Sequence, residues 1–308
     1  MVCPFCKAQT PINGWGYRKT KHRGKIPRYK CMLCMHVFVE KTFVERMWYE
    51  EDRVASAVLL HLQGVTEEDV ADFLEISWRT VERWLEKFGS LWDKYCSKLK
   101  PMYCNTLHLD EIFFKMLGRF LIGWDSLVRE THWLTIAPTG NREADSARGL
   151  LEASPLAHKQ IVTDGLKSYV QPIKDKYKRG AKHLVCEGKA KYLNNLIEGT
   201  QSFIRRFTRP RRGFKRVNKA IAHLRRYQNY RNFIKDNRAI GMPPAQKYGY
   251  VQYAGGMSKK QRLLQLLRAA HQLFWLIKKW VSHPIFSQTQ KPTNRKCQEC
   301  PRKHYGYL

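Results

Sequence analysis

The sequence predicts an α/β fold in which a mixed five-stranded sheet with flanking helices follows a small cysteine-rich module and a three-helix domain. Three observations predict it: two C-x2-C pairs near the N-terminus, apolar residues at helical spacing after them, and then short β-branched runs separated by helical stretches. The chain has 308 residues and 43% hydrophobic content, enough for several domains with buried cores. We expect domains at residues 1–45, 46–98 and 99–250, followed by a basic helical extension at 251–308.

The cysteine-rich module reads as a zinc ribbon. Its cysteines form the pattern C-x2-C-x24-C-x2-C, in which four thiolates can converge on one Zn²⁺. The predicted ligands are Cys3, Cys6, Cys31 and Cys34. Four unrelated buried cysteines are the alternative, but so short and basic a stretch has little core to bury them in. Basic and aromatic residues alternate between the two pairs, which suits contact with phosphates.

Residues 46–95 carry the apolar spacing of three short helices. Thr66 and Ser77 stand where they can cap the second and third helices, and the short joint between those helices predicts a helix-turn-helix. Arg79 and Arg83 project beside the buried stripe of the third helix, as in a helix that reads the major groove of DNA. An inert three-helix bundle is the alternative.

Five apolar runs in the third region predict strands. The first three are close together, and helical stretches at about 144–153 and 166–177 separate the others, so the sheet should be mixed. The predicted strands are 107–114, 120–124, 132–137, 160–163 and 183–186.

Carboxylates interrupt this sheet in two places. Asp110 lies in the middle of the first strand and Asp164 ends the fourth, and a buried carboxylate normally has a partner or a metal. Glu198 follows on the polar stripe of a helix. Taken singly, Asp164 could be a turn residue beside Gly165, and Glu198 a solvated surface residue. Together, the three can bind two divalent ions, Mg²⁺ or Mn²⁺, whereas Glu111 should point to the opposite side of its strand.

These carboxylates and their neighbours resemble the motifs of the DDE transposases of insertion sequences, most closely the insertion-sequence-six family. The matching segments are Asp110-Glu111, Thr163-Asp164-Gly165, Asn194-Asn195-Leu196-Ile197-Glu198, Arg205 and Arg212-Gly213-Phe214-Lys215. The resemblance covers about residues 50–235. It implies a ribonuclease-H-like fold, two-metal catalysis by Asp110, Asp164 and Glu198, and DNA strand cleavage and strand transfer at terminal inverted repeats.

Charge supports a nucleic-acid partner. The chain has 56 Lys and Arg against 26 Asp and Glu, a net charge of +30 that repels itself unless a polyanion neutralises it. A ribosome-associated or generally adhesive basic protein is the alternative that charge alone leaves open. Residues beyond 200 are especially basic, and we expect several of them to grip double-stranded DNA beside the active site. These residues are Arg205, Arg209, Arg211, Arg212 and Lys215.

The remaining expectations concern location and assembly. Apolar runs such as 121–124 and 273–277 are far shorter than the ~20 residues of a membrane span, and no signal leader is visible. Nine cysteines, four of them in metal-type pairs, favour a reducing compartment, so we expect a cytoplasmic, nucleoid-associated protein that forms homo-oligomers on DNA. Cys297, Cys300 and His304 supply only three ligands, and we interpret their segment as a basic tail without a metal site.

Two other functions compete with a transposase. A DNA-binding regulator derived from a transposase could use the same ribbon and helix-turn-helix without catalysis, although carboxylates at all three positions argue against a decayed site. A ribonuclease-H-like nuclease could cleave DNA without joining it.

Overall fold

The computed structural model describes residues 3–6, 8, 11–20, 24–39, 49–178, 180–186, 194–211 and 213–281. Arg212, Cys297, Cys300 and His304, which the sequence analysis singled out, lie outside these residues.

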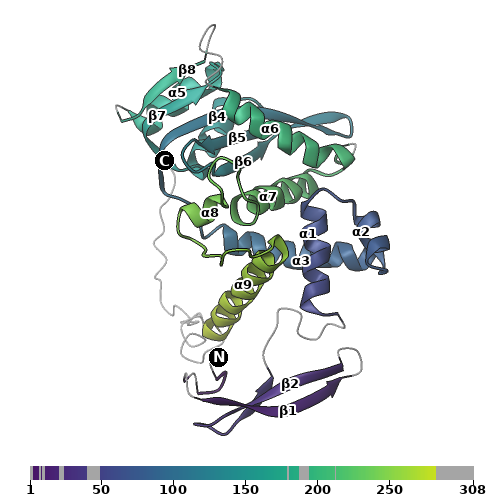
Figure 1. The fold of residues 1–308 in the computed structure, drawn as a ribbon. Coiled ribbons are helices and arrows are strands. Elements are labelled where there is room, and N and C mark those ends of the chain that lie inside the picture. Colours follow the sequence, from purple (N-terminus) through teal and green to yellow (C-terminus); the bar gives the residue numbers. More distant parts are fainter. Residues whose placement is uncertain are drawn as a thin grey trace, which may run out of the picture.

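The N-terminal module is a three-stranded antiparallel sheet with strand order β1-β2-β3 (Figure 1). Its strands are β1 (Ile12–Thr20), β2 (Gly24–Cys31) and β3 (Val37–Val39). Among the described residues of this module, the buried core consists of Cys3, Cys31 and Phe38. A core this small needs another source of stability, such as a bound metal.

Three helices follow, as the sequence predicts: α1 (Glu51–Leu62), α2 (Glu67–Phe73) and α3 (Trp78–Cys96). Thr66 caps α2 as expected, accepting a hydrogen bond from the backbone N–H of Asp69 at 3.1 Å. Ser77 is the N-cap residue of α3, but its side chain makes no capping bond. The third helix is not short: at 19 residues it continues past the helix-turn-helix and leads towards the central sheet.

The central sheet contains the five predicted strands in the order β6-β5-β4-β7-β8. The strands β4, β5 and β6 are antiparallel to one another, whereas β7 lies parallel to β4 and β8 parallel to β7. Most extend beyond the predicted apolar runs: β4 (Tyr103–Met116), β5 (Arg119–Val128), β6 (Leu134–Thr139), β7 (Leu156–Thr163) and β8 (Lys182–Val185). This mixed sheet, with helices on both faces, is the ribonuclease-H-like architecture that the sequence predicts.

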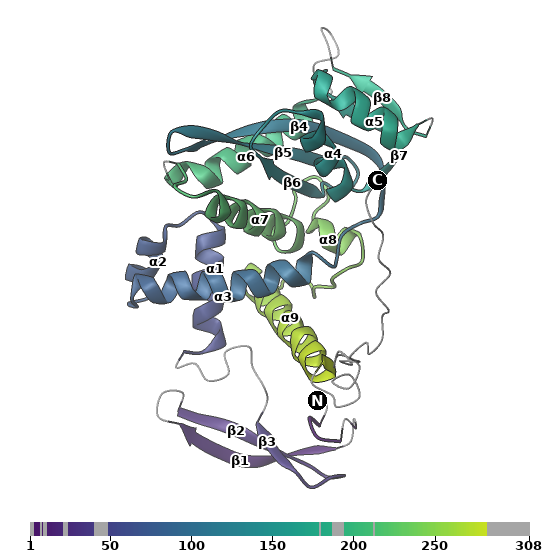
Figure 2. The same ribbon diagram turned by 180° about the vertical axis from the view of Figure 1, so that it is seen from behind.

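Helices cover both faces of this sheet (Figures 1 and 2). One face carries α4 (Ala144–Ala153), the 3₁₀ turn η1 (Lys167–Tyr169) and α5 (Val170–Tyr177). The other carries α6 (Asn195–Thr208), its 3₁₀ extension η3 (Arg209–Arg211) and α7 (Val217–Phe233). A short α8 (Pro244–Lys247) and a long α9 (Lys259–Val281) complete the described chain.

The C-terminal helix α9 packs against α1 and α3, so it joins the helix-turn-helix domain as a fourth helix. Leu263, Leu266 and Leu267 are buried in the shared core. Two ion pairs border the contact: Arg268 to Glu51 at 2.6 Å, and Lys260 to Asp52 at 2.9 Å. The sequence analysis assigned no role to the extension at residues 251–308. The structure shows that α9, which is part of it, packs on the helix-turn-helix domain. No helix within the described ranges is long and apolar enough to cross a membrane.

We predict that Leu267→Ala lowers the free energy of unfolding by about 2–5 kcal/mol, because it leaves a cavity between α9 and the helix-turn-helix core. Leu264→Ala, on the same helix but only partly buried, is the matched control and should cost clearly less. Urea denaturation of the full chain measures both. Equal effects would show that α9 does not pack as described.

Candidate active site and metal centres

The parallel pairing of β4 with β7 brings Asp110 and Asp164 together. The last paired residues are His108 and Val162. Asp110 lies two positions further along β4, and Asp164 lies two positions beyond Val162, just after β7 ends. Carboxylate oxygens of Asp110, Glu111 and Asp164 lie within 4.8 Å of one another. We call these three side chains the acidic group.

Asp110 is half-buried and fixed by two hydrogen bonds. It accepts one from the backbone N–H of Glu111 at 2.8 Å and another from the Asn194 side-chain amide at 3.3 Å. Burial is the main cause that raises the pKa of Asp110, and the negative charges of Asp164, Glu111 and Glu198 add to it. The backbone hydrogen bond from Glu111 lowers the pKa, and the net value is about 7. Asp110 therefore sits where its negative charge is poorly compensated by the protein.

Asp164 is exposed just after β7. Its carboxylate accepts a hydrogen bond from the backbone N–H of Leu166 at 3.1 Å. Asp164 is therefore a turn residue, the alternative considered from the sequence, and it also belongs to the acidic group.

Glu198 is exposed on the first turns of α6. Its charge contributes to the raised pKa of Asp110, so it lies near the acidic group, but it is not one of the three carboxylates of that group. The structure thus brings Asp110 and Asp164 together directly and places Glu198 at a greater distance.

Glu111 is closer to the site than strand alternation suggests. Its side chain is buried on the face that carries α4, where it binds the Arg142 guanidinium at 3.1 Å. Its other oxygen, Oε1, is buried from solvent. Burial raises the pKa of Glu111, and nearby Asp164 adds to the effect. The side chains of Asp110 and Glu111 do alternate along the strand. Glu111 is nevertheless too close to the acidic group to serve as an independent control for variants of Asp110.

Asp125 is a further carboxylate, which the sequence analysis missed. It lies opposite Asp110 on β5 and is fully buried. Gln201 of α6 donates to both Asp125 Oδ1 and the backbone carbonyl of Glu111 at 3.1 Å, and Arg205 donates to Gln201 at 3.2 Å. Burial first, and then the charge of Asp110, raise the pKa of Asp125 well above its usual range. The sequence did offer a signal for Asp125, because it is an acidic residue within the otherwise largely apolar run of β5.

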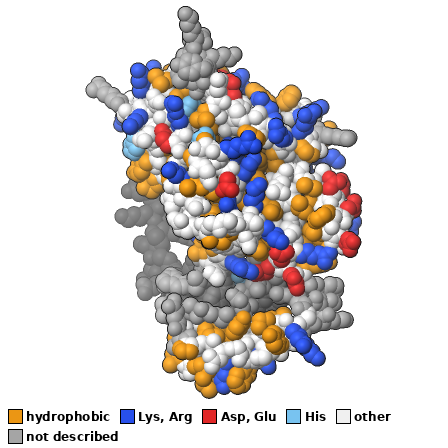
Figure 3. All heavy atoms as spheres, in the orientation of Figure 1, with side chains coloured by type: hydrophobic (Ala, Val, Ile, Leu, Met, Phe, Trp, Pro, Cys, Tyr) orange, Lys and Arg blue, Asp and Glu red, His pale blue; other side chains and the backbone are white. Residues whose placement is uncertain are grey.

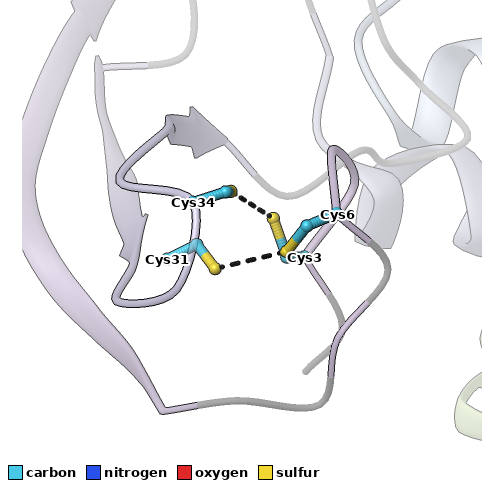
Figure 4. A group of neighbouring side chains, drawn as sticks. All are labelled: Cys3, Cys6, Cys31 and Cys34. Carbon is cyan, nitrogen blue, oxygen red and sulfur yellow. Dashed lines mark hydrogen bonds between the residues drawn. The ribbon is translucent and has the colours of Figure 1, made fainter.

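The four predicted zinc ligands converge in the N-terminal module (Figure 4). The sulfurs of Cys3 and Cys34 are 3.5 Å apart, those of Cys6 and Cys31 are 3.6 Å apart, and all four lie within 4.8 Å of one another. A tetrahedral Zn²⁺ with bonds of about 2.3 Å separates its sulfur ligands by about 3.8 Å. The arrangement therefore fits a four-cysteine metal site.

The predicted DNA-contacting residues lie on two surfaces. Arg79 and Arg83 are exposed on α3, and the Arg79 guanidinium lies 5.8 Å from the ring centre of the exposed Trp78. In the second set, Arg205, Arg209 and Lys215 are exposed, and Arg211 ends η3.

Comparison with known families identifies the core. Residues 104–237 match the DDE domain of a transposase family, and this segment contains Asp110, Asp164 and Glu198. The chain therefore contains a DDE transposase domain. Residues 48–90 match a homeodomain-like domain, which accounts for the helix-turn-helix and makes DNA the partner of the transposase. Both matches are consistent with the insertion-sequence-six family.

Solved structures similar to the transposase include two from retroviruses. The HTLV-2 integrase catalytic core domain in complex with magnesium is 12% identical, with a TM-score of 0.36, over 48% of this chain and 97% of that one. The simian T-cell lymphotropic virus intasome in complex with the PP2A regulatory subunit B56 gamma is 11% identical, with a TM-score of 0.38, over 66% of this chain and 79% of that one. No curated protein matches the chain in sequence.

The raised pKa of Asp110 predicts a pH-dependent stability. With a pKa near 3.8 when unfolded and about 7 when folded, Asp110 binds more protons in the folded state between these values, so its ionisation destabilises the metal-free protein as pH rises through this window. Asp110→Asn cannot ionise. We compare the free energy of unfolding of this variant with that of the wild type. From pH 4 to pH 8, the difference should shift by about 1–4 kcal/mol in favour of the variant.

Denaturation without added divalent ions at both pH values measures this shift. The exposed Asp145→Asn, outside the acidic group, is the control. A pH-independent difference between Asp110→Asn and the wild type would contradict the prediction.

Proposed function

We propose that this transposase binds the terminal inverted repeats of an insertion sequence, cuts a DNA strand there and joins the freed end to target DNA, using divalent ions held by Asp110, Asp164 and Glu198. The observation that carries the proposal is the acidic group inside the DDE domain. In the reaction, water displaces the 3′ oxygen of a phosphodiester and frees a 3′ hydroxyl. That hydroxyl then attacks a target phosphodiester and displaces a second 3′ oxygen, so the number of phosphodiester bonds is conserved in the joining step.

The residues fit Mg²⁺ or Mn²⁺. Both ions prefer oxygen ligands, and the acidic group offers three carboxylates whose oxygens lie within 4.8 Å of one another. When bound, such ions activate the attacking oxygen and stabilise the leaving one. The protein contributes orientation: Asn194 and the backbone N–H of Glu111 hold Asp110, and Gln201 ties β4 and β5 to α6. Glu111 is a further candidate ligand.

The two basic surfaces would align the DNA. Arg79 and Arg83 on α3 are placed to reach base edges and phosphates in a major groove. Arg205, Arg209, Arg211, Arg212 and Lys215 would hold phosphates near the acidic group. An element has two ends to be processed, so we propose a symmetric homo-oligomer on DNA, acting in the cytoplasm at the nucleoid.

For the N-terminal module we propose a structural Zn²⁺ bound by Cys3, Cys6, Cys31 and Cys34, supported by the spacing of their sulfurs and the small core around them.

A DNA-binding regulator without catalysis remains the second candidate, and the DNA-binding domain alone would serve it. A nuclease is distinguished by its products, because it releases cut DNA and forms no joined strand.

The carboxylates provide the main test. Asp110→Asn, Asp164→Asn and Glu198→Gln keep the side-chain size but remove the charge that holds divalent ions, so each should reduce cleavage and strand transfer by about 100-fold or more without abolishing DNA binding. A Mg²⁺-dependent assay with labelled element ends measures cleaved and joined products.

Asp145→Asn removes an exposed carboxylate outside the acidic group and should keep full activity. Glu111→Gln belongs among the test variants, because its carboxylate is part of the acidic group. Full activity in Asp110→Asn, Asp164→Asn or Glu198→Gln would overturn the assignment of that residue.

The zinc proposal predicts that Cys31→Ser loses bound zinc from the purified full chain, since one missing thiolate opens the tetrahedral site. Cys96→Ser, which removes a buried cysteine of α3 instead, should keep about one equivalent of zinc. Elemental analysis of both proteins decides: equal zinc content in the two variants would contradict the site.

A further inference from the structure

A second group of cations gathers on the side of α6 away from Arg205. Three cations lie around the ring of Phe203, with distances to its centre of 4.9 Å for Lys235, 5.5 Å for Arg231 and 5.7 Å for Arg206. We call these four residues the Phe203 cluster. They come from α6, from the end of α7 and, for Lys235, from the residues just after α7, and Figure 3 shows Lys and Arg side chains gathered over these two helices.

Within the described ranges, the cations of this cluster have no acidic partner. None of the ion pairs there includes Arg206, Arg231 or Lys235, and the nearby Asp236 is paired with Arg262 at 2.6 Å. Burial lowers the pKa of Lys235, and the positive charges of Arg231, Lys259, Arg206 and Arg238 lower it further. The cluster is therefore an uncompensated concentration of positive charge.

Arg231 is the most informative member. Its side chain is only 7% exposed, its Nε has no hydrogen-bond partner among the described residues, and one terminal nitrogen makes a long contact of 3.4 Å to the Thr200 hydroxyl. A buried guanidinium without an anion costs stability, because it gives up hydration without a matching charge. Contact with the Phe203 ring offsets only part of this cost.

The exposed parts of the cluster are open to a ligand. Phe203 is 40% exposed and Arg206 is exposed beside it, while Arg231 forms the buried floor. Several guanidinium and ammonium groups around one point match the oxygens of a phosphodiester, which guanidinium groups bind through paired hydrogen bonds.

We propose that Arg206, Arg231 and Lys235 form a phosphate-binding site for the DNA backbone. This site is separate from the contacts proposed for Arg205, Arg209, Arg211, Arg212 and Lys215. The two sites lie on different sides of α6: Arg205 binds Gln201 on the side of the acidic group, and Arg206 is rotated by about 100° from it. DNA bound there would cross α6 outside the active site. This inference rests on the proposed function, because it takes DNA as the polyanion.

The test measures binding of a labelled DNA duplex by the zinc-loaded full chain without added magnesium, over a range of salt concentrations. Arg206→Ala/Lys235→Ala should weaken binding by about 10-fold or more and reduce the salt slope by about 1–2, because contacts to phosphates are lost. Lys159→Ala/Lys174→Ala removes the same charge from exposed positions elsewhere and should change binding and slope much less.

Arg231→Met supplies a readout that a structural arginine would not give. It should leave the thermal midpoint of the DNA-free protein unchanged or raised, because it removes a buried unpaired charge, and still weaken DNA binding. A lowered midpoint with unchanged DNA binding would show that Arg231 is structural and would overturn the proposal.

Two further measurements distinguish a failure of this inference from a failure of the proposed function. Arg79→Ala/Arg83→Ala reports on the helix-turn-helix: if it weakens binding while the Phe203-cluster variants do not, this inference fails and the proposed function stands. If the wild type binds no DNA, both fail. Stabilisation by inorganic phosphate that the cluster variants lose, with DNA binding unchanged, would assign the site to a small anion and overturn the assignment to DNA.

Discussion

The parallel pairing of β4 with β7 is the constraint on which the rest of the site depends. Because the two strands run in the same direction, Asp110 and Asp164 come side by side where β7 ends, and Glu111 lies close to both. Burial raises the pKa of Asp110, and the neighbouring carboxylates add to the effect. The helices on the two faces then fix this group, α6 through Asn194 and Gln201, and the opposite face through Arg142.

The helix α3, which we propose to read DNA, is attached directly to this core. Gly89 of α3 lies so close to the Arg226 side chain that a Cβ atom there would meet its Nε at 2.5 Å. Asp93 accepts a hydrogen bond from Asn229 at 2.6 Å, and Lys219 pairs with Glu82 at 3.5 Å. Contacts of α3 with α7 on one side and with α9 on the other fix the orientation of the helix-turn-helix relative to the sheet. DNA held by α3 is thereby held at a set position relative to the acidic group.

Charge is distributed to match this arrangement. The carboxylates of the acidic group and Asp125 lie around the central strand β4, whereas cations lie on both sides of α6, with Arg205 next to Gln201 and Arg206 next to Phe203. A net charge of +30 is thus concentrated in part where a DNA backbone could neutralise it. The same separation leaves negative charge where divalent ions could bind.

The sequence by itself determined the elements and the chemical types at the site. Strand and helix periodicity arises from local alternation, so all five strands and the helices around Asp110, Asp164 and Glu198 could be predicted, and the cysteine spacing identified the sulfur cluster. Tertiary structure alone decided which distant residues meet. Asp125 faces Asp110 only because β5 pairs with β4 in one register, Glu111 joins the acidic group only because β7 lies beside β4, and the cations meet around Phe203 only because α7 ends against α6. Local periodicity carries no information on the register or packing that creates such contacts.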